Sequence, residues 1–142
     1  MEIILRCNPP KSTAQASNRI LKGKNGKYFV GKMQSSKAKQ TESDLISLLC
    51  PYVPEIPLED ALRVEIKWVY PWRSAEPKKN KAKGFKFCDT RPDADNICKL
   101  LFDTMTRLGF WIDDSQIAEL HFQKLWADEP RIEINITQID ED

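Results

Sequence analysis

Apolar and polar residues alternate most regularly in the middle of the chain, between Leu62 and Tyr70. A period of two predicts a β-strand that turns one face to the core and the other to solvent. The same alternation recurs at 118–122 and 132–136, on either side of a polar turn at 127–130. The apolar start, Glu2 to Cys7, is typical of a further strand. The pattern therefore predicts a sheet of about four or five strands.

Helical spacing replaces this alternation in two segments. Ser36 to Cys50 reads as a helix that stops before a proline. A second helix follows Asp95, because apolar residues recur there every three or four positions up to Gly109. A chain of 142 residues that is 41% apolar can bury one modest core. We therefore expect an α+β fold in a single domain, 1–142, with two principal helices packed on a mixed sheet.

Three segments show neither the alternation of a strand nor the spacing of a helix. An Asn-Gly pair within Lys24–Lys27 predicts a hairpin turn that leads into Tyr28–Val30. The prolines of Pro51–Pro57 predict an extended linker. The lysine-rich stretch 73–86 has no apolar periodicity, so we expect a mobile loop there. Phe85 at its end and Phe87 just after it could stack on unpaired bases, although packing in a strand or core is the more common role.

The net charge of +1 hides an uneven distribution. Nine lysines and arginines and no acid lie between Ile3 and Thr41, and six bases face one acid at 71–88. From Asp89 onward, 13 acids face five bases. Scattered lysines are usually solvated surface, but basic segments of this kind also bind the phosphates of nucleic acids. The predicted DNA contacts are Lys11, Arg19, Lys78, Lys79, Lys81, Lys83 and Lys86.

The acids are most concentrated in the segment 91–117. Asp93 and Asp95 precede the second predicted helix, and Asp113 and Asp114 follow it. Carboxylates held close together repel one another unless a cation lies between them, so the two pairs indicate a site for magnesium or manganese. Asp93 and Asp95 alone could equally cap the helix, but a cap does not require the second pair.

Spacing within this segment suggests separate roles. Adjacent side chains of an extended segment point to opposite faces, so only one of Asp113 and Asp114 should reach a metal directly. Lys99 lies one turn after Asp95 and could stabilise charge on a phosphate. Its alternative role is an ordinary ion pair with Asp95 or Asp103, which contributes only ~0.2–0.5 kcal/mol. The residues alone leave both roles open.

Other acidic sites fit the spacing less well. An EF-hand loop counted from Asp93 would need glycine at Cys98 and glutamate at Thr104. A phosphatase with an Asp-x-Asp nucleophile would need a buried strand before the acids, but 87–92 is short and polar. A glycosyltransferase also uses Asp-x-Asp, but the chain is short for that architecture and has no glycine-rich phosphate loop.

The acidic segment also resembles a known family. Asp-Ala-Asp-Asn-Ile-Cys-Lys at 93–99, Phe-Asp at 102–103 and Gly-Phe-Trp-Ile-Asp-Asp at 109–114 are similar to the RusA family of Holliday-junction resolvases. Members of this family are phage and prophage endodeoxyribonucleases. The resemblance is specific across 91–117, which we term the metal motif, and it extends through the final strands to Ile136.

The resemblance implies a function for each member of the motif. Asp93, Asp95 and Asp114 would be catalytic and would bind Mg²⁺, for which Mn²⁺ is a possible substitute, with Asp113 supporting them. Lys99 matches the catalytic lysine of the family. A homodimer would then nick opposing strands of a four-way DNA junction in recombination and repair. The competing hypothesis is a DNA-binding module without catalysis, in which the acids serve as helix caps.

Location can also be predicted from the sequence. The chain contains no apolar run long enough to span a bilayer. Its start lacks the basic flank and long apolar stretch of a signal peptide. We therefore expect a cytoplasmic protein with no membrane partner.

Overall fold

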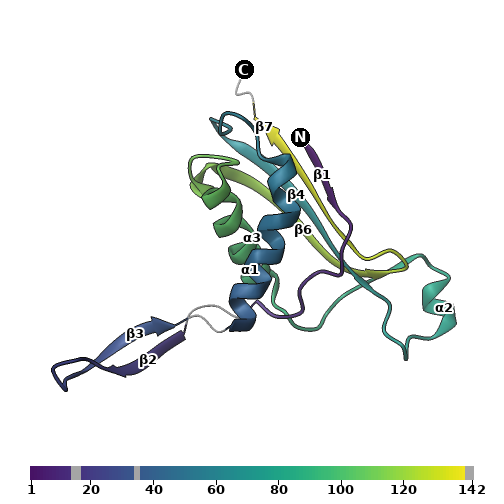
Figure 1. Cartoon of the computed structure of the whole chain (residues 1–142). Coiled ribbons are helices and arrows are strands. Elements are labelled where there is room, and N and C mark those ends of the chain that lie inside the picture. Colours follow the sequence, from purple (N-terminus) through teal and green to yellow (C-terminus); the bar gives the residue numbers. More distant parts are fainter. Residues whose placement is uncertain (14–16, 34–35, 140–142) are drawn as a thin grey trace.

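The computed structural model of the chain describes residues 1–13, 17–33 and 36–139, with side chains at 1–13, 22–28 and 36–139. It confirms the predicted α+β fold, because its main body is a five-stranded mixed sheet with helices packed on it (Figure 1). In their order across the sheet, the strands are β1 (Glu2–Leu5), β7 (Arg131–Gln138), β4 (Leu62–Pro71), β6 (Ile117–Ala127) and β5 (Phe85–Phe87).

The central strand β4 pairs in parallel with β6 and antiparallel with β7. β1 and β5 form the two edges, each antiparallel to its neighbour. Because neighbouring parallel strands cannot be joined by a tight turn, the chain between β4 and β6 must cross over. This crossover, residues 72–116, carries all four acids of the predicted metal site.

Two helices, α1 (Ser36–Leu49) and α3 (Ala94–Leu108), lie together over the sheet (Figure 1). α3 buries the predicted apolar stripe, with Leu101 and Met105 fully enclosed, because residues three and four apart share one side of a helix. At its end Gly109 has a φ of +91°, a left-handed conformation that favours glycine. The chain therefore turns back towards the sheet at the predicted position.

The alternation in β4 has the predicted effect. Leu62, Val64, Ile66 and Trp68 are buried in the main core, whereas Glu65 and Lys67 are exposed on the opposite face. Further along, that outer face carries a second, smaller apolar cluster formed by Val69, Leu125 and Ala127.

The predicted hairpin is present as β2 (Ser17–Lys22) and β3 (Tyr28–Met33), which form a separate two-stranded sheet (Figure 1). Helix α1 ends before Pro51 as predicted, but it continues into a turn of 3-10 helix at Cys50–Tyr52 rather than directly into the extended linker. Within the described ranges, no helix is long and apolar enough to cross a lipid bilayer.

The prediction of a loop without regular structure at 73–86 is wrong. This segment contains a short helix, α2 (Lys78–Lys81), and leads into the edge strand β5. Such short elements cannot display a period in the sequence, so periodicity could not reveal them. They are held in place by contacts with Glu76, which is buried.

Candidate active site

The first acidic pair lies at the start of α3. The chain enters the helix through a cis Arg91–Pro92 peptide bond, and Asp93 occupies the N-cap position with an extended backbone. The Asp93 side chain nevertheless makes no capping hydrogen bond, and both Asp93 and Asp95 are exposed. Helix capping therefore does not account for the carboxylate of Asp93, which is available to bind a ligand.

A lysine that the sequence analysis missed fixes the approach to this pair. Lys124 of β6 donates hydrogen bonds from Nζ to the carbonyl oxygens of Thr90 and Pro92, the latter at 2.6 Å. The register pairs Lys124 with Trp68, a core residue, so its side chain lies on the inner face of the sheet. A lysine on the apolar side of an alternating strand was the signal that could have revealed it. Lys124 thereby anchors the backbone immediately before Asp93.

The second pair follows the turn at Gly109. Phe110 and Trp111 are buried there, and the indole Nε1 of Trp111 donates a 2.6 Å hydrogen bond to Oγ1 of Thr106. These two aromatic residues attach the segment to the core directly before Asp113. The position of the second pair therefore depends on the same packing that ends α3.

The conformation of the second pair differs from the predicted extended segment. Asp113 is extended, but Asp114 begins a 3-10 turn, η2 (Asp114–Gln116). The side-chain oxygen of Gln116 accepts hydrogen bonds from the backbone amides of Ile112 and Asp113, at 2.8 and 3.0 Å. Its amide nitrogen donates to the carbonyl oxygens of Leu58 and Asp60. Gln116 therefore connects the turn to the segment before β4, which local sequence could not show.

The two neighbouring carboxyl groups have different environments. Ser115 donates a 2.6 Å hydrogen bond to Oδ2 of Asp113 and, with nearby backbone amides, lowers the pKa of that carboxyl. Partial burial, followed by the negative charges of Asp113 and Asp103, raises the pKa of Asp114. Asp114 thus lies beside other acids, among them Asp103 of α3.

The two acidic pairs do not form one metal-binding group among the described residues. Asp103 follows Asp95 by eight residues, which corresponds to ~12 Å along a helix axis. Among the described residues, no three acids, histidines or cysteines lie close enough to hold one metal ion. Lys99 is exposed and forms no ion pair with any described residue, so an ion pair does not explain its position. The assignment of a metal and a catalytic role to these residues stays a prediction.

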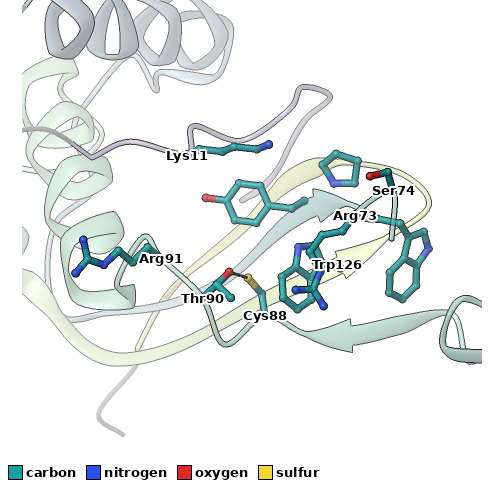
Figure 2. A pocket seen from close by; sticks show the side chains of 10 residues that line it. Lys11, Arg73, Ser74, Cys88, Thr90, Arg91 and Trp126 are labelled. Carbon is teal, nitrogen blue, oxygen red and sulfur yellow. Dashed lines mark hydrogen bonds between the residues drawn. The ribbon is translucent and has the colours of Figure 1, made fainter. Parts of the chain in front are cut away.

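Basic side chains from the first segment lie beside the first acidic pair. A cleft of about 370 Å³ is lined by Lys11, Arg91 and Asp93, together with Ser12, Thr13, Pro92 and Asn96. A neighbouring cleft of about 450 Å³ is also lined by Lys11 and Arg91, and by Arg73 on its far side (Figure 2). Lys11 and Arg91 thus line the cleft at the start of α3, and Arg73 lines the neighbouring cleft. The side chain of Arg19, another predicted contact, lies outside the described residues.

Tyr70 holds the first basic segment in place. Its hydroxyl donates a 2.7 Å hydrogen bond to the carbonyl oxygen of Pro10 and accepts one of 3.0 Å from Nε1 of Trp68. Burial raises the pKa of Tyr70 to about 12, so the hydroxyl stays protonated at neutral pH. The tether sets the backbone position of Lys11, which is exposed.

The second basic segment, residues 71–88, is built around Glu76, whose side chain is only 1% exposed. Its carboxylate accepts hydrogen bonds from Asn80, Arg73 and Lys86, at 2.9, 3.0 and 3.3 Å. These partners lower its pKa. Arg73 also lies over the ring of Trp126, 4.2 Å from the centroid (Figure 2).

The lysines of this segment fall into two groups. Lys86 is paired with Glu76 and lies 5.6 Å from the Trp126 ring centroid, so its ammonium is already engaged. The other predicted DNA contacts of the segment, Lys78, Lys79, Lys81 and Lys83, are on or next to α2, and all except the half-buried Lys81 are exposed.

Comparisons with known proteins identify a family. The family model for endodeoxyribonuclease RusA matches residues 9–137. A crossover junction endodeoxyribonuclease of Lactococcus phage r1t is 43% identical over 61 residues, which are 43% of this chain and 47% of that protein. The RusA crossover junction endodeoxyribonuclease of Escherichia coli K12 is 38% identical over 50 residues, 34% of this chain and 42% of that protein.

A longer match is to the uncharacterised protein YqaN of Bacillus subtilis strain 168. It is 29% identical over 121 residues, which are 82% of this chain and 83% of YqaN. In contrast, the chain spans less than half the length of the two named endonucleases that it matches.

Proposed function

The chain belongs to the RusA endodeoxyribonuclease family, and on this basis we propose that it is a structure-selective DNA endonuclease. Its substrate is the four-way Holliday junction, which it resolves in DNA recombination and repair by hydrolysing phosphodiester bonds. The names of two relatives, both crossover junction endodeoxyribonucleases, support this substrate class.

One structural observation carries the proposal. Lys11 and Arg91 line the same cleft as Asp93, although Lys11 comes from the other end of the sequence. Cations bind the phosphates of a DNA backbone, and carboxylates can hold the metal ion that acts on one of them. The fold therefore joins a phosphate-binding segment to the first acidic pair, which is the arrangement that a metal-dependent nuclease needs.

The alternative, a DNA-binding module without catalysis, is less well supported. It assigns the acids to helix capping, which fits Asp113 in its capping box with Gln116, but the Asp93 side chain makes no such hydrogen bond. It assigns Lys99 to an ion pair, and Lys99 has none among the described residues. Both side chains are thus exposed, and within the part of the chain that the structure describes neither makes the contact that this alternative assigns to it, which supports a role in catalysis.

The cofactor that fits the first pair is Mg²⁺. Asp93 and Asp95 offer hard oxygen donors that are exposed, and magnesium is commonly held by one or two carboxylates together with substrate phosphates. When bound, the cation supplies positive charge at the phosphate and helps to generate the nucleophile from water. Lys99, one turn further along α3, is positioned to offset negative charge on the same phosphate.

The second acidic pair leads to the proposal of a homodimer. Among the described residues the four acids do not form one metal-binding group, and a second chain could supply the missing carboxylates. Two-fold symmetry would also supply the two nicks that resolve a junction. Light scattering at micromolar concentration should give twice the 16.4 kDa of one chain. A monomer whose activity rises linearly with concentration would contradict this part of the proposal.

The central experiment is cleavage of a labelled four-way junction by the purified protein. We expect paired nicks with magnesium, none with a chelator, and no cutting of a linear duplex with the same arm sequences. Gel-shift binding to the junction is measured in parallel with chelator present. Tight binding without cleavage under any divalent cation would instead support the non-catalytic DNA-binding module.

A further inference from the structure

We infer that Phe85 and Phe87, with the lysines of α2, form a platform on which unpaired nucleobases stack. This inference rests on the proposed function for its substrate, because the branch point of a junction is where bases become available for stacking. The platform lies on the edge strand β5, which ends four residues before the metal motif begins at Arg91.

The two rings are held in place but remain accessible. Phe85 is 50% exposed and Phe87 is 60% exposed, and their centroids lie 5.6 Å apart in an edge-to-face arrangement. The register pairs Phe85 with Ala127 and Phe87 with Leu125. Residues opposite one another share a face of the sheet, so both rings lie on the face that carries the small outer cluster. The two rings therefore contact each other edge to face and leave at least half of their surface open to solvent.

The charges of the segment 73–87 itself match a nucleic acid, and the exposed acids Asp128 and Glu129 lie beside Gly84 at one end of β5. The segment 73–87 contains a single acid, Glu76, which is buried and already paired with Arg73 and Lys86. Consequently the surface of this segment presents the lysines of α2 and no exposed acid. Exposed aromatic rings beside a basic surface are the combination with which proteins bind single-stranded nucleic acids.

β5 presents different groups to its two faces. Lys86 points to the inner face, where it lies over Trp126 beside the larger cleft, whereas Phe85 and Phe87 point to the outer face. A DNA strand that crosses this edge can therefore contact the cleft through its phosphates and the rings through its bases. The bases of an intact duplex are stacked on one another and offer no free face, so the platform discriminates against it.

A second copy of this chain is the other occupant to consider for an exposed apolar pair on an edge strand. Charge opposes it, because two copies meeting at this patch would bring the lysines of both α2 helices together. A polyanion relieves this repulsion instead. The charge of the surroundings thus favours nucleic acid over self-association.

The test compares binding to an oligothymidylate and to a blunt duplex, both with chelator present. Replacing both rings with leucine, Phe85→Leu with Phe87→Leu, keeps apolar side chains on this face of β5 and removes only the aromatic faces. We expect affinity for the single strand to fall by about tenfold or more, since stacking contributes ~1–3 kcal/mol per base. Affinity for the duplex should stay within about twofold, and the salt dependence should not change because no cation is lost.

The matched control is Ile56→Ala, which removes another exposed apolar side chain, in the segment that precedes β4. It should change neither affinity. Circular dichroism confirms folding, and if the double variant does not fold, Phe87→Leu alone replaces it, because Phe87 is the more exposed ring.

Three results would overturn the platform: unchanged binding to the single strand, an equal loss for duplex and single strand, or conversion of a dimer to a monomer by the leucine variant. The proposed function is tested independently, because binding is measured without cleavage. A protein that cuts no junction but needs its rings for single strands would overturn the proposed function and retain the platform.

Discussion

The metal motif, 91–117, and the second basic segment, 71–88, differ in how their charged groups are organised. In the metal motif, Asp93 and Asp95 are exposed, and the second acidic pair lies elsewhere on the chain. In the basic segment, one buried carboxylate, that of Glu76, gathers Arg73, Asn80 and Lys86 around itself. The region with the most specific sequence pattern thus has exposed carboxylates, and the region without a pattern is organised around a buried one.

The difference between the two regions follows from the burial of their carboxylates. A buried carboxylate must be paired within its own fold, because an unpaired buried charge is costly. Exposed carboxylates need no partner within the fold, because water solvates them until a cation binds. The basic segment is therefore held by its own contacts, whereas the exposed acids of the metal motif are the groups whose predicted roles need experimental tests.

The largest effect should come from Asp95→Asn, which keeps the size of the side chain and removes its charge. Cleavage of the junction should fall below detection, because metal chemistry depends on this ligand, while junction binding should persist through the cations of the cleft. Nicking rates and gel shifts measure the two properties separately. Full cleavage by the variant would refute the assignment of Asp95.

The second acidic pair should show unequal effects. Asp114→Asn should abolish cleavage at any practical magnesium concentration, whereas Asp113→Asn should cost ~10–100-fold, as changes to supporting residues typically do. Extra magnesium should partly rescue the second variant and not the first. A magnesium titration of the nicking rate distinguishes them, and the reverse pattern would move the direct ligand to Asp113.

Lys124→Met tests whether the acidic site needs a fixed backbone. The variant keeps the apolar stem of the side chain but loses both hydrogen bonds that hold the carbonyls of Thr90 and Pro92. We expect cleavage to fall by ~10–100-fold through misplacement of Asp93, with duplex binding unchanged. Lys124→Arg should restore part of the rate. Equal rates for all three proteins would show that Lys124 does not position the site.

In the basic segment, replacing Lys78, Lys79, Lys81 and Lys83 together with alanine should weaken binding to every DNA. Each lost phosphate contact should reduce the slope of log affinity against log salt by ~0.9. Lys86→Ala provides an internal comparison, because this lysine is engaged by Glu76 and should change the slope less. A slope that stays the same in the fourfold variant would mean that α2 does not contact DNA.

The smallest effect should be that of pH on Glu76. Its pKa is lowered in the folded protein, so its ion pairs stabilise the segment at neutral pH, and this contribution is lost as the pH falls through the lowered value. The protein should therefore be more stable than Glu76→Gln at pH 7, and the difference should shrink below the ordinary glutamate pKa of about 4.3. Thermal unfolding of both proteins across this range, with amide exchange at 73–87, measures it. A difference independent of pH would exclude a charged Glu76.

The sequence by itself determined the elements in which apolar residues recur with the period of a strand or a helix. The alternation of β4 and the stripe of α3 predicted which side of each element is buried, because side-chain direction depends only on the backbone period. The turn at Gly109 was equally predictable, since glycine accepts a positive φ. The metal motif identified the family for the same reason: its residues are close together in the sequence.

Only the tertiary structure decided how distant segments meet. The crossover from β4 to β6 places Lys124 under the start of α3, and Tyr70 binds the segment that carries Lys11. Burial of Glu76 and exposure of Phe85 and Phe87 were likewise invisible in the sequence, where an acid among lysines looks solvated and a phenylalanine looks buried. Hydrogen bonds and burial depend on which strands become neighbours, and that choice is made by the fold as a whole.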